Sequence, residues 1–159
     1  MNGLKANGPK KDLVVQGCFV HSTTDQSMVI REEMVMGLRE GKIIFFEPKD
    51  KLDELLRSFE MDKENLMVLE KNQFIVPGFI DSHAHAPQYT FMGTGGDLPL
   101  IPWLQKYTYP TETLLNADET FAREVYEKCV SRTLRSGSTT VCYYATISAT
   151  ATRILTDII

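Results

Sequence analysis

Apolar and polar positions divide the chain into two parts with different patterns. Residues 1–12 are polar, rich in Gly, Asn and Lys and without periodicity, which is typical of a mobile tail. Apolar and β-branched runs then predict three short strands, at 13–20, 34–38 and 42–46. Leu and Phe residues at offsets of three, four and seven predict an amphipathic helix over 51–60. We therefore expect residues 13–73 to form a small β-rich domain.

A different pattern begins at Phe74. Residues 74–80 are nearly all apolar, as expected of one strand buried on both faces, and two histidines follow at its carboxyl end. Residues 86–117 hold four of the seven prolines and are predicted to form a long loop. A helical stripe of about 17 residues starts after Asp118, and an apolar strand follows over 138–145.

The order of these elements indicates a fold class. A further helix is predicted from Ala149 onward. Strand, loop, helix, strand and helix in succession are the opening of a parallel α/β architecture. The fold class is therefore α/β, with a small N-terminal β-sheet domain at 13–73 and the α/β part at 74–159.

Charge and composition exclude some functions. The chain has 17 Lys and Arg against 21 Asp and Glu, and its longest basic cluster is Lys10-Lys11, which argues against non-specific nucleic-acid binding. It has no signal-peptide pattern and no run of about 18 apolar residues, so we expect no membrane association and a cytoplasmic location. A hydrophobic fraction of 43% is ordinary for a globular chain.

Candidate chemistry lies at the end of the first α/β strand. His83 and His85 are two positions apart, so on a continuing strand both imidazoles point to the same side. Neutral imidazole is a good ligand for Zn²⁺. A catalytic zinc takes three or more protein ligands, however, and the only other histidine, His21, lies in the N-terminal part. By spacing alone, the pair is either part of a metal site or two ordinary polar histidines.

The residues around the histidines are more specific. The segment from Val76 to His85 reads VPGFIDSHAH and resembles the first barrel strand of the metal-dependent amidohydrolase superfamily. The upstream sheet, with its Gly41–Ile43 segment, is similar to the small β domain that precedes the barrel in these enzymes. The resemblance implies that residues 74–159 are the first strands and helices of an incomplete (β/α)8 TIM-like barrel, since a full barrel needs about 250 residues.

Within the superfamily, the chain resembles the guanine deaminase branch. The similar segments are 83–89, 97–100, 103–110 and 132–146. The resemblance implies hydrolysis of guanine to xanthine and ammonia, one zinc ion per complete active site, His83 and His85 as metal ligands, and a homodimer. It also implies substrate contacts by His85, Ala86, Pro87 and Gln88. The remaining ligands and the general base lie on later strands in the family, so no catalytic residue is assignable here.

Two other functions stay open. One is a related amidohydrolase that acts on another amino-substituted ring. The other is a short, catalytically incomplete isoform or fragment that binds a partner through its exposed sheet edge.

Four further side chains each have two interpretations. The amide of Gln88 can read a purine edge as donor and acceptor, or it is a solvent-exposed loop residue. Asp81 orients a ligand imidazole or the strand end, or it caps a helix or turn. Trp103 and Tyr107 either line the substrate pocket by stacking on a planar base or pack in the core, and the core is the more common place for aromatic residues at this spacing.

Overall fold

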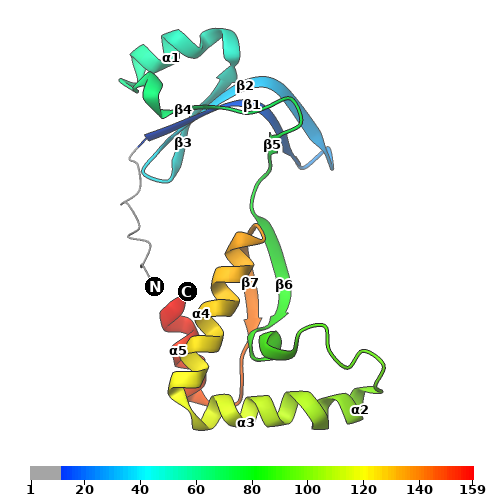
Figure 1. Ribbon diagram of the computed structural model, residues 1–159. Helices are drawn as coiled ribbons and strands as arrows, with labels where there is room; N and C mark the ends of the chain where they lie inside the picture. The colour runs from blue at the N-terminus through cyan, green and yellow to red at the C-terminus, as the bar shows by residue number, and fades with distance from the viewer. Residues whose placement is uncertain (1–11) are drawn as a thin grey trace. The chain divides into compact units, whose positions relative to one another are not determined.

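The chain folds as two compact units that meet between Pro77 and Gly78 in sequence (Figure 1). The computed structural model describes residues 12–159. The predicted mobile tail over 1–12 lies outside the described residues except for Asp12, which is the first residue of strand β1. No helix within 12–159 combines the length and the apolar character needed to cross a membrane.

The first unit is a five-stranded sheet in the order β3-β2-β1-β4, with β5 also paired to β1. The β1–β2 and β2–β3 pairs are antiparallel, whereas β4 and β5 lie parallel to β1. The three predicted strands and the predicted helix are confirmed, with ends shifted by up to five residues. The elements are β1 (Asp12–His21), β2 (Val29–Arg39), β3 (Lys42–Pro48), α1 (Leu52–Ser58), β4 (Leu66–Val68) and β5 (Phe74–Ile75).

One face of this sheet packs against α1. The core cluster consists of Val14, Val35, Phe45, Leu56 and Met61, so each of the three long strands and the helix region contributes to it. Burial of such apolar side chains is the main stabilising contribution in a small unit of this kind. The apolar stripe read from the sequence is therefore the face that α1 buries.

Asp12 is held by an ion pair at the start of β1. Arg39 donates to both carboxylate oxygens of Asp12, at 2.8 and 2.9 Å, and also to the carbonyl oxygen of Phe59 at 2.8 Å. The hydrogen bond and charge of Asp12 raise the pKa of Arg39. The predicted end of the tail at residue 12 is thus wrong by one residue, because this carboxylate belongs to the sheet.

The predicted single strand over 74–80 is wrong, because the apolar run divides between the two units. Phe74 and Ile75 pair with β1, whereas Phe79–His85 forms β6 and pairs with β7. Pro77 lies between them and has no N–H to continue a ladder. The predicted burial on both faces is also wrong, since Phe79 is 59% and Ile80 76% exposed.

The second unit is a pair of parallel strands, β6 and β7, with helices packed on one face (Figure 1). Its elements are β6 (Phe79–His85), the 3-10 helix η3 (Ala86–Phe91), α2 (Leu100–Trp103), the π-helical segment η4 (Leu104–Thr108), α3 (Tyr109–Ala117), α4 (Glu119–Arg135), β7 (Ser138–Tyr144) and α5 (Ala149–Ile158). The predicted strand–helix–strand–helix order is confirmed, and with it the α/β class.

The predicted long loop over 86–117 is wrong, because most of it is helical. Pro99 is the N-cap residue of α2, and Pro110 lies in the first turn of α3. Proline fits the first turn of a helix, because backbone N–H groups there make no hydrogen bond within the helix and proline, which lacks an N–H, loses none. These prolines therefore mark helix starts, and the π-helical segment η4 ends at Thr108, two residues before Pro110.

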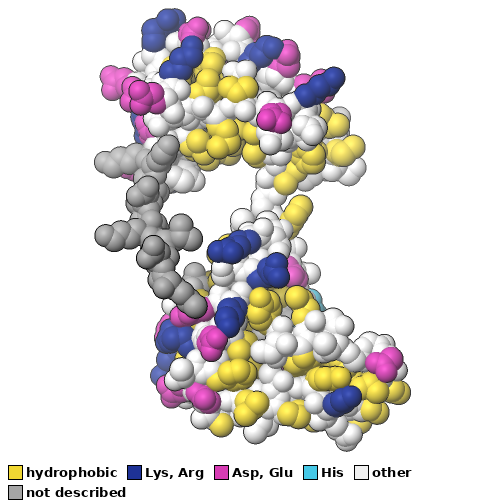
Figure 2. All heavy atoms as spheres, viewed as in Figure 1, with side chains coloured by type: hydrophobic (Ala, Val, Ile, Leu, Met, Phe, Trp, Pro, Cys, Tyr) yellow, Lys and Arg dark blue, Asp and Glu magenta, His cyan; other side chains and the backbone are white. Residues whose placement is uncertain are grey.

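The predicted 17-residue helix is confirmed as α4. The Asp118 side chain accepts a hydrogen bond from the Phe121 backbone N–H at 3.0 Å, and Gly137 follows the helix with φ of 91°. The buried side of α4 packs against α5, and the core includes Ala122, Tyr126, Ile154 and Leu155. Figure 2 shows Lys and Arg side chains together with Asp and Glu side chains over the solvent side of α4. The helix thus separates an apolar core from a surface with charges of both signs.

Candidate active site

His83 and His85 lie on the same face of β6, as the strand alternation predicts. Their Nε2 atoms are 3.0 Å apart, and the ring centroids are 5.0 Å apart. Two zinc–nitrogen bonds of about 2.0–2.1 Å can join nitrogens at this separation. The two imidazoles therefore fit a shared metal ion as a pair of neighbouring ligands.

Asp81 supports the backbone of the histidine strand. Its Oδ1 accepts a hydrogen bond from the backbone N–H of His83 at 3.1 Å. The carboxylate thus contacts the backbone within β6, and this bond is to the main chain of His83 and not to its imidazole. This bond to the backbone two residues along the chain is of the Asx-turn type, so it fits the capping interpretation as well as orientation of the strand, and the role of Asp81 stays a prediction.

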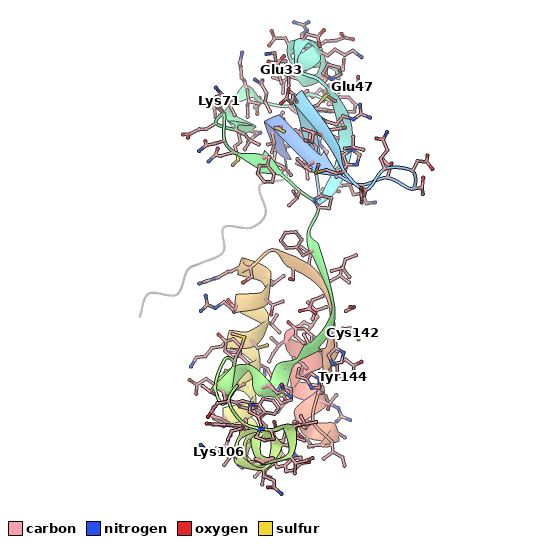
Figure 3. The ribbon with its side chains drawn as sticks, turned by 90° about the vertical axis from the view of Figure 1, so that its right-hand side faces the viewer. Glu33, Glu47, Lys71, Lys106, Cys142 and Tyr144 are labelled. Carbon is pink, nitrogen blue, oxygen red and sulfur yellow. The ribbon has the colours of Figure 1, made fainter. Side chains whose placement is uncertain are left out.

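Tyr144 is a site residue that the sequence analysis missed. It lies opposite His85 in the parallel β6–β7 register. Its ring stacks on His83 at a centroid distance of 4.4 Å and on His85 at 4.9 Å. Tyr144 and Cys142 project from β7 on the side away from α4 (Figure 3). The strand alternation of β7 was visible in the sequence, but the register that brings Tyr144 to the histidines was not.

A third metal ligand is absent from the part of the chain that the structure describes. Across residues 12–159, no group of three or more His, Cys, Asp or Glu side chains is placed to hold a metal ion. His21 lies on β1 in the first unit, where its Nδ1 is 3.2 Å from the carbonyl oxygen of Ser22. The described residues thus provide two ligands of a candidate metal centre.

An open cavity of about 680 Å³ lies beside the histidines. Its lining includes His83, His85, Ala86, Gln88, Asp81 and Trp103. Trp103 donates a hydrogen bond from Nε1 to the carbonyl oxygen of Thr94 at 3.1 Å, which restrains the indole in the cavity lining. Its place in the lining fits the pocket-wall interpretation.

Pro87 and Tyr107 do not line this cavity. Pro87 is almost fully buried. Tyr107 stacks on Phe91, with ring centroids 5.8 Å apart, and leaves no room for a side chain at Gly95. Tyr107 therefore packs among other aromatic residues, which is the core interpretation.

Titratable groups behind the strands are held in their neutral forms. Burial raises the pKa of the Cys129 thiol and of Tyr143, and it raises the pKa of Tyr126 to about 12. A thiol nucleophile needs the thiolate, which a raised pKa disfavours. Although Cys129 lines the cavity, it is therefore a structural thiol and not a candidate nucleophile.

Comparisons with known proteins identify similar sequences and structures. Residues 74–157 match the sequence model of the Amidohydrolase family. Guanine deaminase of Mus musculus is 40% identical over 154 residues, which cover 96% of this chain and 34% of that protein. Guanine deaminase of Dictyostelium discoideum is 40% identical over 167 residues, covering 98% and 36%. A solved structure of guanine deaminase from C. acetobutylicum, with guanine bound in its active site, superposes with a TM-score of 0.72 at 26% identity, covering 92% of this chain and 33% of that one.

The matches cover nearly all of this chain but only part of each relative. The chain spans about a third of the length of the curated relatives it matches. The family match covers 84 of its 159 residues and includes β6, β7 and both histidines. The chain therefore belongs to the amidohydrolase family.

Proposed function

We propose that this chain forms the N-terminal part of a zinc-dependent guanine deaminase, which hydrolyses guanine to xanthine and ammonia. The observation that carries the proposal is the pair of imidazole Nε2 atoms 3.0 Å apart at the end of β6. The 40% identity to guanine deaminases over nearly the whole chain supports guanine as the substrate.

The proposal includes the architecture that the resemblance implies. Residues 13–73 are the small β domain, and β6 and β7 are the first two strands of a (β/α)8 barrel. In such a barrel the active site lies at the carboxyl ends of the strands, which is where His85 stands on β6. Later strands supply the other metal ligands and the general base. A homodimer and a cytoplasmic location belong to the same proposal.

The two histidines and Asp81 have separate tasks in this proposal. His83 and His85 would hold part of a zinc site, and zinc bound there would supply hydroxide at neutral pH by lowering the pKa of water to about 7. The imidazoles hold the ion through neutral Nε2 atoms. Asp81 keeps the His83 backbone in place through its hydrogen bond to the N–H.

Gln88 and the cavity are proposed to hold the purine. A volume of about 680 Å³ lies within the range of about 300–1,000 Å³ found for small-molecule sites. The Gln88 amide offers a donor and an acceptor, which match complementary atoms on a purine edge. Trp103 limits the pocket at its rim.

The first experiment is zinc binding by the purified 159-residue chain, measured by competition with a chromophoric chelator. We expect His83→Ala and His85→Ala each to weaken zinc binding by more than about tenfold, since each removes one of two ligands. His21→Ala is the matched control, because this histidine lies on β1, and it should bind as the unaltered chain does. Equal zinc affinity in His83→Ala and the unaltered chain would show that the ligand assignment is wrong.

A second experiment tests the reaction. In a chimera, this chain replaces the matching 34% of the mouse guanine deaminase, and ammonia release is measured with guanine, adenine and cytosine. We expect turnover of guanine and its loss in His83→Ala. Gln88→Ala should lower guanine turnover far more than zinc content. Equal losses of zinc and turnover would instead assign Gln88 a structural role, and preference for adenine or cytosine would exclude guanine as the substrate.

A further inference from the structure

Tyr144 makes its contacts with the two histidines through the face of its ring. The phenol ring is nearly parallel to both imidazoles, with interplanar angles of 24° to His83 and 18° to His85. His85 and Tyr144 are directly paired across the parallel strands, and His83 lies two residues earlier on the same face. One aromatic ring thus packs on both members of the imidazole pair.

Two ordinary explanations for this aromatic residue do not fit. Tyr144 is 45% exposed and lies outside the core cluster, which takes Tyr143 from the opposite face of β7. Tyr144 is also absent from the lining of the cavity beside the histidines. Within residues 12–159 its ring contacts are therefore with His83 and His85, outside the core cluster and the cavity lining.

We propose that Tyr144 is a positioning residue that holds the imidazoles of His83 and His85 with their Nε2 atoms facing each other before a metal ion binds. This inference rests on the proposed function, in which the two histidines are metal ligands.

The physical basis is the number of conformations open to two exposed histidines. Each imidazole on a bare strand can adopt several staggered χ1 rotamers and two ring orientations, and few combinations bring both Nε2 atoms within reach of one ion. Stacked aromatic rings attract each other beyond the area they bury. A flat neighbour on the paired strand therefore favours the binding arrangement, which lowers the entropic cost of metal binding.

Nuclear magnetic resonance of the metal-free chain tests the contact itself. At a fixed pH of about 8, above the ordinary pKa of an imidazole, the ring current of Tyr144 should displace the carbon-bound proton signals of both histidines. Tyr144→Leu should remove this displacement, and Tyr144→Phe should keep it. Tyr109→Leu, at another exposed tyrosine with 52% exposure against 45%, should leave it unchanged. Histidine signals that do not respond to Tyr144→Leu would overturn the stacked arrangement.

Zinc affinity of the same variants tests the positioning role. We expect Tyr144→Leu to bind zinc about 10- to 100-fold more weakly than the unaltered chain, as is found for residues that orient metal ligands. Tyr144→Phe should restore the affinity, because the ring is kept and only the hydroxyl is lost. Tyr109→Leu should be unchanged, and circular dichroism should show all variants folded.

The outcomes separate the two proposals. Unaltered affinity in Tyr144→Leu, while His83→Ala abolishes binding, would overturn the positioning role and leave the proposed function standing. Zinc binding that is unaffected by His83→Ala would overturn the proposed function. Weak binding in both Tyr144→Leu and Tyr144→Phe would show that the hydroxyl, and not the stacked ring, is what matters, and this too would overturn the inference.

Discussion

Replacing Tyr126 with phenylalanine removes a hydroxyl from the core of the second unit. Tyr126 lies on α4, its side chain is fully buried, and within residues 12–159 its hydroxyl makes no hydrogen bond of ordinary length and angle. Burial raises the pKa of the phenol to about 12, and the charge of Glu112 adds to this, while a weaker hydrogen-bonding interaction with the Thr146 side chain lowers it. The folded chain therefore holds this proton more tightly than the unfolded chain does.

The difference between the folded and unfolded pKa of Tyr126 sets the sign and size of the change in stability with pH. An unfolded tyrosine has a pKa of about 10, so above this pH the unfolded state loses its proton while folded Tyr126 keeps it. Stability then falls as pH rises from about 10 to about 12. Two pKa units correspond to at most about 2.7 kcal/mol, of which about 2 kcal/mol is lost by pH 11.5. At pH 7 the Tyr126→Phe variant should be equally stable, or more stable by up to about 1 kcal/mol, because an unpaired buried hydroxyl is gone.

Urea unfolding at several pH values from 8 to about 11.5 measures this directly. Trp103 is the single tryptophan and belongs to the same unit, so its fluorescence reports the unfolding of that unit alongside circular dichroism. The unaltered chain should lose more stability above pH 10 than Tyr126→Phe does. Tyr109→Phe is the control, since this tyrosine is 52% exposed, and it should follow the unaltered chain. Identical losses in the unaltered chain and Tyr126→Phe would refute the reasoning.

Two further predictions concern the ends of α4. Asp118→Ala should lower the free energy of unfolding by about 1 kcal/mol in urea titrations, because Phe121 N–H loses its acceptor, and Asp118→Asn should retain most of it. Gly137→Ala should cost about 1–2 kcal/mol, because φ there is 91° and a methyl group would touch Phe79. Gly96→Ala is its control, since a methyl group at Gly96 meets nothing within 4 Å, and it should be close to neutral. An equal cost at both glycines would contradict the assigned role of the backbone conformation.

Local signals predicted the regular elements well. The α4 helix has a long apolar stripe, an Asp at the N-cap and a Gly after its end, and these agree with one another. The hairpin of β2 and β3 was marked by a turn with Gly41, whose φ is 75°. Where periodicity and end signals point the same way, little tertiary information is needed.

The errors arose where one local pattern has two structural meanings. The run from Phe74 to Ile80 is apolar because two separate strands contribute to it, and no periodicity distinguishes one buried strand from two short ones. Residues 86–117 were assigned to a loop because of their prolines, although proline at the first turn of a helix favours a helix. Partner strands and helix ends decide these cases, and both are tertiary features.

Some features of the candidate site were predictable from local sequence patterns, and others depend on tertiary structure. Strand alternation predicted that His83 and His85 face the same side, and the structure adds the distance of 3.0 Å between their Nε2 atoms. Tyr144 was missed because its place beside them depends on the register between β6 and β7, which are separated by 52 residues. Tyr107 and Trp103 have similar sequence contexts and both pack on Phe91, yet only Trp103 lines the cavity, and this difference depends on tertiary packing that the sequence does not show.

The pairing of β5 with β1 has a consequence for synthesis on the ribosome. Cys18 and Phe74 are partners across 56 positions of chain, so one edge of the central strand β1 stays incomplete while those residues are translated. At about 5–20 residues per second, this interval lasts about 3–11 seconds. Translation of β6 begins three residues after β5 is finished. All strands of the N-terminal sheet are thus translated before β6, the strand that carries the two histidines. The order of translation therefore allows the first unit to assemble before the second.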